Sequence, residues 1–299
     1  MGCVLEINNL TKKYSTFELK SISFQIRAGE VMGFIGRNGA GKTTALKSIL
    51  NLVHPDAGNV RILGMDYLDN EDEIKQRIGY AVGGTNYYKR KKLKDIVAIT
   101  RIFYDNWDDE SYRHYLDAFK LDENKKIMEL SEGMKVKFYL TLALSHQARL
   151  LILDEPTTGL DPAAIDEFYD YIKTLKQEGV TIIMSTHYLY GMDGVVDSIG
   201  IISEGKILIS DAVDKLRRQD KQVHFEGKFK PDHIKELLAH GQVSGNLQDE
   251  FTISVENDDQ LADLVRSLVQ KGNDIHYVYK VRETVKEIYF RIIGVDSHE

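Results

Sequence analysis

Short apolar runs alternate with longer amphipathic segments over the first two thirds of the chain. This alternation predicts an α/β fold with a parallel sheet, because parallel strands are usually joined by helices. Several of the runs are apolar at every position, which indicates strands that are buried on both faces. The strand candidates are Val31–Ile35, Ile78–Val82, Leu150–Leu153, Thr181–Ser185 and Ile199–Ser203.

The clearest predicted helix begins after Asp161, which can cap it, with Pro162 as its first residue. Gly179 predicts the end of this helix, because glycine readily adopts the left-handed conformation. One helix face is apolar and carries Ile165, Phe168, Tyr169, Ile172 and Leu175. From about 85 to 145 the strand signal gives way to helical spacing, so we expect a helical subdomain there.

A new pattern begins after residue 217. Val223, Phe225 and Phe229 indicate a strand, and the strict alternation of Phe251, Ile253 and Val255 indicates another. The pattern then predicts a helix capped by Asn257, a strand over 275–279, a helix around 285–292 and, earlier, a helix start at Pro231. We therefore expect two domains, 1–217 and 218–299, the second a small α+β accessory domain.

Composition narrows the class of protein. The 299 residues are 42% hydrophobic, which is enough for a folded core, and carry a formal net charge of −7. The acidic excess argues against a nucleic-acid partner. A single cysteine, Cys3, excludes an internal disulfide framework. No run approaches the ~20 apolar residues of a membrane span, and the N-terminus has no signal-peptide pattern.

Residues 36–43 match the phosphate-binding loop of nucleotide-binding proteins. The run follows a predicted strand and precedes helical residues 44–53, as this loop requires. Its glycines let the backbone N–H groups turn toward phosphate oxygens, while the helix N-terminus attracts negative charge. We expect Lys42 to reach the β- and γ-phosphates and Thr43 to bind Mg²⁺. The expected nucleotide-binding residues are Gly36, Arg37, Asn38, Gly39, Ala40, Gly41, Lys42, Thr43 and Thr44.

Two carboxylates, Asp154 and Glu155, follow the apolar strand at 150–153. Because parallel strands end at one edge of a sheet, we expect both side chains beside the phosphate-binding loop. Asp154 is expected to bind Mg²⁺ through water, and Glu155 to orient or deprotonate the attacking water. Solvated acids at a strand end are the alternative, which the phosphate-binding loop makes weaker.

His187 ends the next strand candidate, where an imidazole can contact the γ-phosphate and hold Glu155 and water in line. A single histidine after an apolar strand is more often structural. The nine histidines show no spacing typical of metal ligands, so we expect no zinc site.

Over about residues 3–216 the sequence resembles the ATP-binding cassette (ABC) ATPases. Residues 130–134, Leu-Ser-Glu-Gly-Met, resemble the family's signature motif, and residues 154–161 resemble its joined Walker B motif and D-loop, which ends at Asp161. Tyr14 matches the aromatic residue that stacks on adenine. The resemblance implies the ABC type of P-loop nucleotide-binding domain, ATP and Mg²⁺ as cofactors, and Glu155, His187 and Lys42 as catalytic residues.

The resemblance also implies a dimer in which two ATP molecules are sandwiched between two cassettes. Ser131, Glu132 and Gly133 of one subunit would then contact the ATP that is bound by the other. A hydroxyl and a backbone N–H at a helix start suit a γ-phosphate.

Two positions depart from the family pattern. Glu132 replaces the first glycine of the signature, and its carboxylate would repel phosphate unless the side chain turns away. Gly83 stands where the family usually has a glutamine that contacts Mg²⁺ and couples to the membrane partner; Gln76 lies too early. Slow hydrolysis, or coupling through Asn86 or the backbone, are the two interpretations.

A basic run, Lys89-Arg90-Lys91-Lys92-Leu93-Lys94, follows Tyr87 and Tyr88. The simplest interpretation is a solvated loop. The alternative is a face that lies near anionic lipid headgroups or the cytoplasmic loops of a permease.

The signature form and the C-terminal extension most resemble the ATPase subunits of ABC type 2 exporters, in particular bacterial subunits for peptide export and antimicrobial-peptide resistance. The resemblance implies an ATP-hydrolysing subunit that dimerises with itself or a related chain and drives export through a separate integral-membrane permease. It would be cytoplasmic and peripheral at the membrane. A regulatory or sensing subunit with weak hydrolysis, and a soluble non-transport ABC ATPase, are the alternatives.

Overall fold

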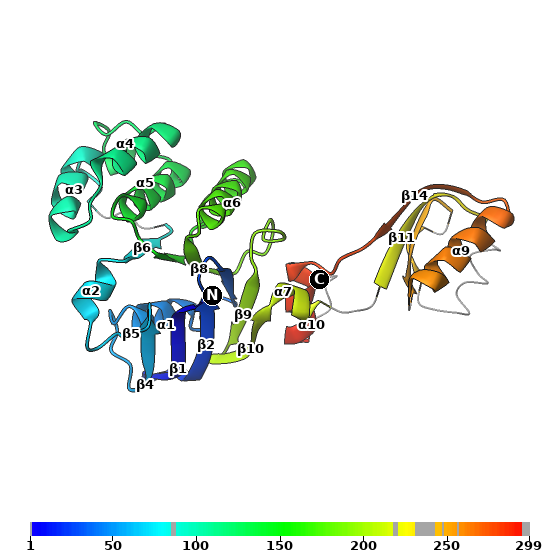
Figure 1. The fold of residues 1–299 in the computed structure, drawn as a ribbon, viewed down its shortest axis with the longest axis horizontal. Coiled ribbons are helices and arrows are strands. Elements are labelled where there is room, and N and C mark those ends of the chain that lie inside the picture. The colour runs from blue at the N-terminus through cyan, green and yellow to red at the C-terminus, as the bar shows by residue number, and fades with distance from the viewer. Residues whose placement is uncertain are drawn as a thin grey trace. The chain divides into compact units, whose positions relative to one another are not determined.

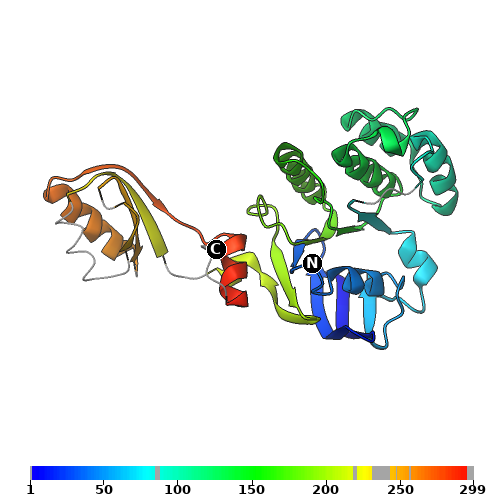
Figure 2. The same cartoon turned by 180° about the vertical axis from the view of Figure 1, so that it is seen from behind.

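The structure is a computed structural model that describes residues 2–84, 88–217, 221–230, 243–246, 248–255 and 257–294. The chain divides into two units, Met1–Val213 and Asp214–Glu299 (Figure 1, Figure 2). The sequence-based division was placed between residues 217 and 218. Asn86, Tyr87 and Pro231, which figured in the sequence analysis, lie outside the described residues, as do positions 85 and 218, where the predicted helical subdomain and second domain begin.

The central sheet of the first unit has six strands in the order β10-β9-β3-β8-β7-β6. Five run parallel, and β10 pairs antiparallel with β9. All five predicted strands are confirmed, and β3, β7 and β8 are buried throughout, as their apolar runs indicated. The bounds are β3 Val31–Ile35, β6 Ile78–Val82, β7 Leu150–Asp154, β8 Thr181–Thr186, β9 Ser198–Ser203 and β10 Lys206–Ala212.

A second, antiparallel sheet has the order β2-β1-β4-β5, with β1 Cys3–Lys13, β2 Glu18–Arg27, β4 Ala57–Ile62 and β5 Met65–Asp66. Helix α1 (Lys42–Ile49) shares one buried core with strands of both sheets, through Ala45, Leu46 and Ile49. The prediction that this helix extends to residue 53 was wrong. It ends at Ile49 because Asn51 adopts a left-handed conformation, with φ of 52°.

Helices fill the described part of the predicted helical subdomain. α3, α4 and α5 lie together beside β6 (Figure 1). The bounds are α2 Glu71–Lys75, α3 Leu93–Thr100, η1 Arg101–Phe103, α4 Asp109–Ala118, η2 Ile127–Glu129, α5 Glu132–Ser145 and α6 Pro162–Gln177. The predicted cap of α6 is confirmed, because the Asp161 carboxylate accepts a hydrogen bond from the Ala164 N–H at 2.9 Å.

The second unit contains a four-stranded antiparallel sheet in the order β12-β13-β11-β14. Its core is centred on Phe225 and Phe251, whose stacked rings lie 4.9 Å apart, and it includes Leu268 of α9. Asn257 caps α9, as predicted, by accepting a hydrogen bond from the Gln260 N–H. The bounds are α7 Val213–Leu216 at the junction, then β11 Lys221–Lys228, β12 Val243–Ser244, β13 Glu250–Val255, α9 Asp258–Gln270, β14 Asp274–Lys280 and α10 Val285–Ile293.

A polar cluster ties the helical subdomain to the start of β6. The Gln76 side chain donates to the Phe103 carbonyl at 2.7 Å and accepts from the Asp105 N–H at 3.0 Å. The residue between them, Tyr104, stacks on His146 with ring centroids 3.8 Å apart. His146 lies in turn against the Gln76 carbonyl, at 3.3 Å. Burial lowers the pKa of His146 from 6.5 to about 4.

We expect the first unit to lose stability as the pH falls from about 7 to about 5, in part through His146. The unfolded state protonates this imidazole near its ordinary pKa of 6.5, whereas the folded state keeps it neutral down to about 4. The unfolded state therefore binds the extra proton in this range, which lowers the free energy of unfolding by about 2 kcal/mol. Urea unfolding followed by the fluorescence of Trp107, the only tryptophan, measures this change.

The matched control is His146→Phe, which retains a ring against Tyr104 and does not titrate. Its unfolding free energy should change less between the two pH values than that of the wild type. An equal change in both proteins would show that another group carries the pH dependence.

Candidate functional site

The phosphate-binding loop leads from the carboxyl end of β3 into α1. Gly41, at the start of α1, has φ of 109°, and a Cβ there would lie 2.6 Å from Cζ of Phe17. Any other residue would strain the backbone and displace that ring. No side chain caps α1, so the N–H groups of its first turn have no side-chain hydrogen-bond partner. Free N–H groups at a helix N-terminus are the groups that bind phosphate.

Lys42 is 5% exposed, and its ammonium lies within the curl of the loop. Nζ donates to the carbonyl oxygens of Gly36 and Arg37, at 2.7 and 3.2 Å. It also forms an ion pair with Oε1 of Glu155 at 2.9 Å. A phosphate entering the loop would compete with this carboxylate for the same cation.

Asp154, at the end of β7, is 2% exposed and accepts two hydrogen bonds at Oδ1. The donors are the hydroxyls of Ser185, at 2.6 Å, and Thr43, at 3.2 Å. A carboxylate beside a hydroxyl is a hard oxygen pair of the kind that Mg²⁺ prefers, so these residues fit that ion. Sequence reasoning missed Ser185, which lies inside an apolar strand pattern.

Glu155 links the loop to the end of β8. Its Oε2 lies 2.8 Å from Nδ1 of His187, while its backbone N–H donates to the Ser185 hydroxyl at 3.0 Å. Glu155 has φ of 50°, a conformation that few non-glycine residues adopt. The backbone therefore places this carboxylate between Lys42 and His187, where it can accept a proton from a bound water.

Lys42, Thr43, Glu155 and His187 line one cleft of about 680 Å³. Four other residues predicted from the sequence are not among its lining: Gly36, Arg37, Ala40 and Asp154. Tyr14 stands at it, half exposed, in a turn closed by the hydrogen bond from its N–H to the Phe17 carbonyl. Among the residues predicted from the sequence, the cleft is lined by Tyr14, Asn38, Gly39, Gly41, Lys42, Thr43, Thr44, Glu155 and His187. Sequence reasoning missed four more lining residues, Ser15, Thr16, Phe17 and Thr158.

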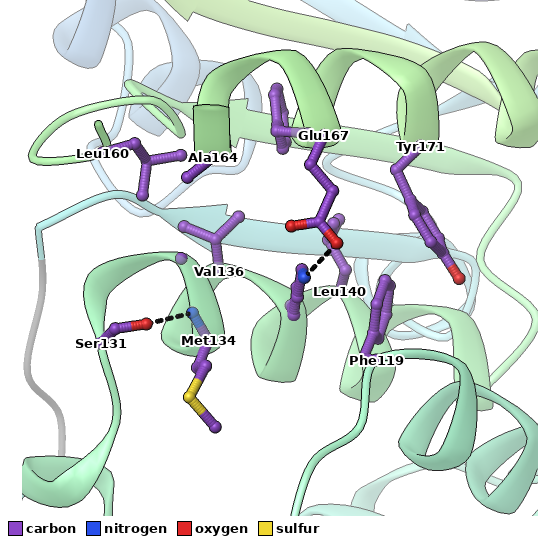
Figure 3. Close-up of a pocket in the computed structure, with 12 residues that line it drawn as sticks. Phe119, Ser131, Met134, Val136, Leu140, Leu160, Ala164, Glu167 and Tyr171 are labelled. Carbon is purple, nitrogen blue, oxygen red and sulfur yellow. Dashed lines mark hydrogen bonds and ion pairs between the residues drawn. The ribbon is translucent and has the colours of Figure 1, made fainter. Parts of the chain in front are cut away.

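The signature residues do not line this cleft. Ser131 caps α5 by accepting a hydrogen bond from the Met134 N–H at 3.2 Å. With Gly133 it lines a separate pocket of about 100 Å³ between α5 and α6. Figure 3 shows Ser131 and Met134 on the α5 side of this pocket and Leu160 and Ala164 on the other. The signature residues and the phosphate-binding loop therefore line separate pockets of the chain.

The carboxylate of Glu132 is paired within its own helix. Oε1 lies 2.6 Å from Nζ of Lys135, a side chain that is 8% exposed. The ion pair offsets the negative charge that Glu132 brings to the signature. Lys135 therefore compensates the charge of Glu132, the residue that departs from the family pattern. Sequence reasoning missed this pair.

Gly83 lies directly against the backbone of Glu155. A Cβ on Gly83 would lie 1.9 Å from the Glu155 carbonyl oxygen, and its N–H donates to the Asp154 carbonyl at 2.8 Å. No side chain, glutamine included, fits position 83 with this backbone. The second departure is therefore part of how the two carboxylates are held.

Among the described residues, no group of three or more His, Cys, Asp and Glu side chains is arranged to hold a metal ion. None of the helices in the same ranges combines the length and the apolar character that a membrane crossing requires.

The chain is similar in sequence and fold to known proteins. Residues 19–158 match the family model described as ABC transporter. The bacitracin transport ATP-binding protein BcrA of Bacillus licheniformis is 30% identical, with 98% of each chain aligned. The uncharacterized ABC transporter ATP-binding protein YcbN of Bacillus subtilis is 31% identical over 99% of each chain. A solved ATP-binding subunit of an ABC transporter aligns with a TM-score of 0.64 and 28% identity, covering 72% of this chain and 92% of that one.

We expect Gly83→Ala to reduce ATP hydrolysis by at least about tenfold, because the added Cβ displaces the backbone that positions Glu155. Steady-state phosphate release measures the effect. The control is Gly84→Ala, where φ of 66° imposes strain but the nearest atom to a Cβ, Cγ2 of Thr158, is 3.7 Å away. Equal activity in the two variants would contradict this account of Gly83.

Proposed function

The chain belongs to the ABC transporter family as an ATP-binding subunit, and from this premise we propose that it hydrolyses ATP in a dimer to drive export through a separate membrane permease. The observation that supports the hydrolytic role most directly is the sequence of contacts from Lys42 through Glu155 to His187. It joins a phosphate-binding cation to a carboxylate base and a positioning imidazole in one cleft.

Binding of ATP would rearrange the Lys42–Glu155 pair. The γ-phosphate is the stronger competitor for a buried ammonium, because it carries more charge than one carboxylate. Lys42 would then bind phosphate while the Glu155 carboxylate becomes free to accept a hydrogen bond from the attacking water. Tyr14, at the same cleft, is placed to stack on the adenine ring.

Thr43 and Asp154 are the residues that would hold Mg²⁺, the first directly and the second through water. When bound, the ion neutralises phosphate charge during transfer. Ser185 holds Asp154 in place, because its hydroxyl donates to the same carboxylate that Thr43 reaches.

His187 would act on both the base and the phosphate. With Nδ1 facing Glu155, the doubly protonated imidazole would donate one hydrogen bond to that carboxylate and the other, from Nε2, toward the γ-phosphate. In that position the imidazole fixes the direction of the carboxylate and helps align the water with the phosphorus atom.

The separation of the two sets of residues supports the proposed dimer. Ser131 and Gly133 lie at a pocket distinct from the cleft, so one chain cannot bring them to its own ATP through this arrangement. In a pair of chains, Ser131 and the N-terminus of α5 would meet the γ-phosphate held by the other chain, with Asp161 at the same interface. Closing around ATP and opening after hydrolysis would drive the permease.

The relatives named for bacitracin transport support a peptide antibiotic as the exported substrate. Attachment to the permease would place the chain peripherally on the cytoplasmic face of the membrane. A regulatory or sensing subunit with weak hydrolysis is the second candidate, and the observation that favours it is Gly83 in place of the family's glutamine.

We expect Glu155→Gln to lower ATP hydrolysis by at least about a hundredfold, because the amide cannot accept a proton from water. Its affinity for ATP should remain, since Lys42 and the loop are intact. With ATP and Mg²⁺, light scattering should show a trapped dimer. Hydrolysis at the wild-type rate would contradict the role of Glu155.

Two further variants separate binding from dimer formation in that experiment. Lys42→Ala, in the Glu155→Gln background, should lose ATP binding and the dimer together. Ser131→Arg in the same background should bind ATP and stay monomeric, because a bulky cation obstructs the proposed contact with the other chain's phosphate.

We expect a host that expresses the chain with its permease to gain resistance to a bacitracin-type peptide. The measurement is the minimal inhibitory concentration with wild type or Glu155→Gln. Export requires turnover, so the variant should confer no resistance. Equal protection by both proteins would favour the sensing role.

A further inference from the structure

The fold brings two basic segments of the helical subdomain together. The Met128 N–H donates to the Lys89 carbonyl at 3.0 Å, and the Leu93 N–H donates to the Lys125 carbonyl at the same distance. Lys92 and Lys126 form an isolated bridge between the segments. The basic run of the sequence is therefore extended by a lysine pair about thirty positions later. We define the basic surface as Lys89, Arg90, Lys91, Lys92, Lys94, Lys125 and Lys126.

The cations of the basic surface carry no salt bridges to described residues. Six are exposed and Lys92 is half-buried; Lys94 donates one hydrogen bond, to the amide oxygen of Asn124 at 2.9 Å. Three carboxylates in the second segment accept hydrogen bonds from other groups. They are Asp122 from the Asn124 N–H, Glu123 from the Tyr112 hydroxyl and Glu129 from the Lys126 N–H.

Charge is divided unequally over the chain. Residues 88–94 and 122–129 hold seven cations and three carboxylates, which gives these two segments a formal charge of +4. Because the formal net charge of the whole chain is −7, all its other residues together carry −11. A negatively charged plane would attract this surface and repel the remainder of the protein. The division therefore favours one orientation against an anionic surface.

Two exposed apolar side chains accompany the cations. Tyr88, which precedes Lys89, is 68% exposed. Met128, whose N–H donates to the Lys89 carbonyl, is 61% exposed. Proteins that lie on membranes combine basic side chains for the headgroups with apolar ones for the interface. Protein interfaces are also enriched in tyrosine, methionine and arginine, so the test of this surface includes a readout that separates a lipid from a protein partner.

We propose that the basic surface binds anionic phospholipid headgroups, so that the cassette has a membrane contact of its own besides the permease. The cations lie near phosphate groups, and Tyr88 and Met128 enter the interfacial layer. Each cation at such a surface strengthens partitioning about fivefold, and the attraction falls off within about 10 Å at moderate salt.

Sedimentation of the purified full chain with vesicles tests this directly. The vesicles contain phosphatidylcholine alone or with about 30 mol % phosphatidylglycerol, at about 0.1 M and about 0.5 M salt. We expect binding to the anionic vesicles at low salt, with at least a tenfold loss in high salt and on neutral vesicles.

The test variant replaces Lys89, Arg90, Lys91 and Lys125 with glutamine, and binding to anionic vesicles should fall roughly a hundredfold or more. The control replaces Lys20, Arg27, Arg61 and Lys206 with glutamine, four exposed cations without salt bridges on other strands of the first unit. The control should keep most of the wild-type binding, although both variants have the same net charge. Solution ATPase activity, equal in all three proteins, confirms that each is folded.

Three outcomes would overturn the proposal. The wild type could bind neutral and anionic vesicles equally, or both variants could lose binding to the same extent, which would indicate a dependence on net charge alone. In the third, the test variant would bind vesicles as the wild type does but no longer co-purify with the permease, which would assign the surface to a protein contact.

Discussion

Lys42 and Glu155 meet because three parallel strands end at the same level. The register pairs Ile35 of β3 with Thr186 of β8, and Ser185 of β8 with Asp154 of β7, so the residues that follow each strand converge on one edge. A buried ammonium is tolerable only beside a carboxylate or an anionic ligand, because an unpaired charge away from water is costly. The ion pair thus keeps the loop shaped for phosphate and ready to exchange one anion for another.

The same edge accounts for glycine at position 83, where the resemblance to the family implies a glutamine. Glu155 is held in a left-handed conformation, which turns its carbonyl toward the end of β6 and leaves no room for a Cβ at Gly83. Gln76, at the other end of that strand, makes two hydrogen bonds to the helical subdomain. The glutamine side chain that connects the sheet to the helical subdomain is therefore Gln76, which lies at the start of β6.

The sequence was sufficient where the signal was local. Continuous apolar runs identified β3, β7 and β8, a capping aspartate identified the start of α6, and glycine spacing identified the loop, because each depends on neighbours along the chain. The pairing of Glu132 with Lys135 was equally local but was not considered. Ser185 under Asp154, Tyr104 on His146, and the lysines at 125–126 beside the basic run depend on contacts between distant segments. No periodicity reports such contacts.

A membrane contact on the helical subdomain would favour formation of the proposed dimer. The signature and the cleft of one chain lie at separate pockets, and the proposed dimer would bring the signature of one chain to the cleft of another. Confinement to a surface raises the effective concentration of the partners and limits their orientations, which favours that encounter without any new contact between them. The acidic remainder of the chain disfavours other faces at the same surface. Binding through the basic surface would therefore favour the encounter between two cassettes that the proposed dimer needs.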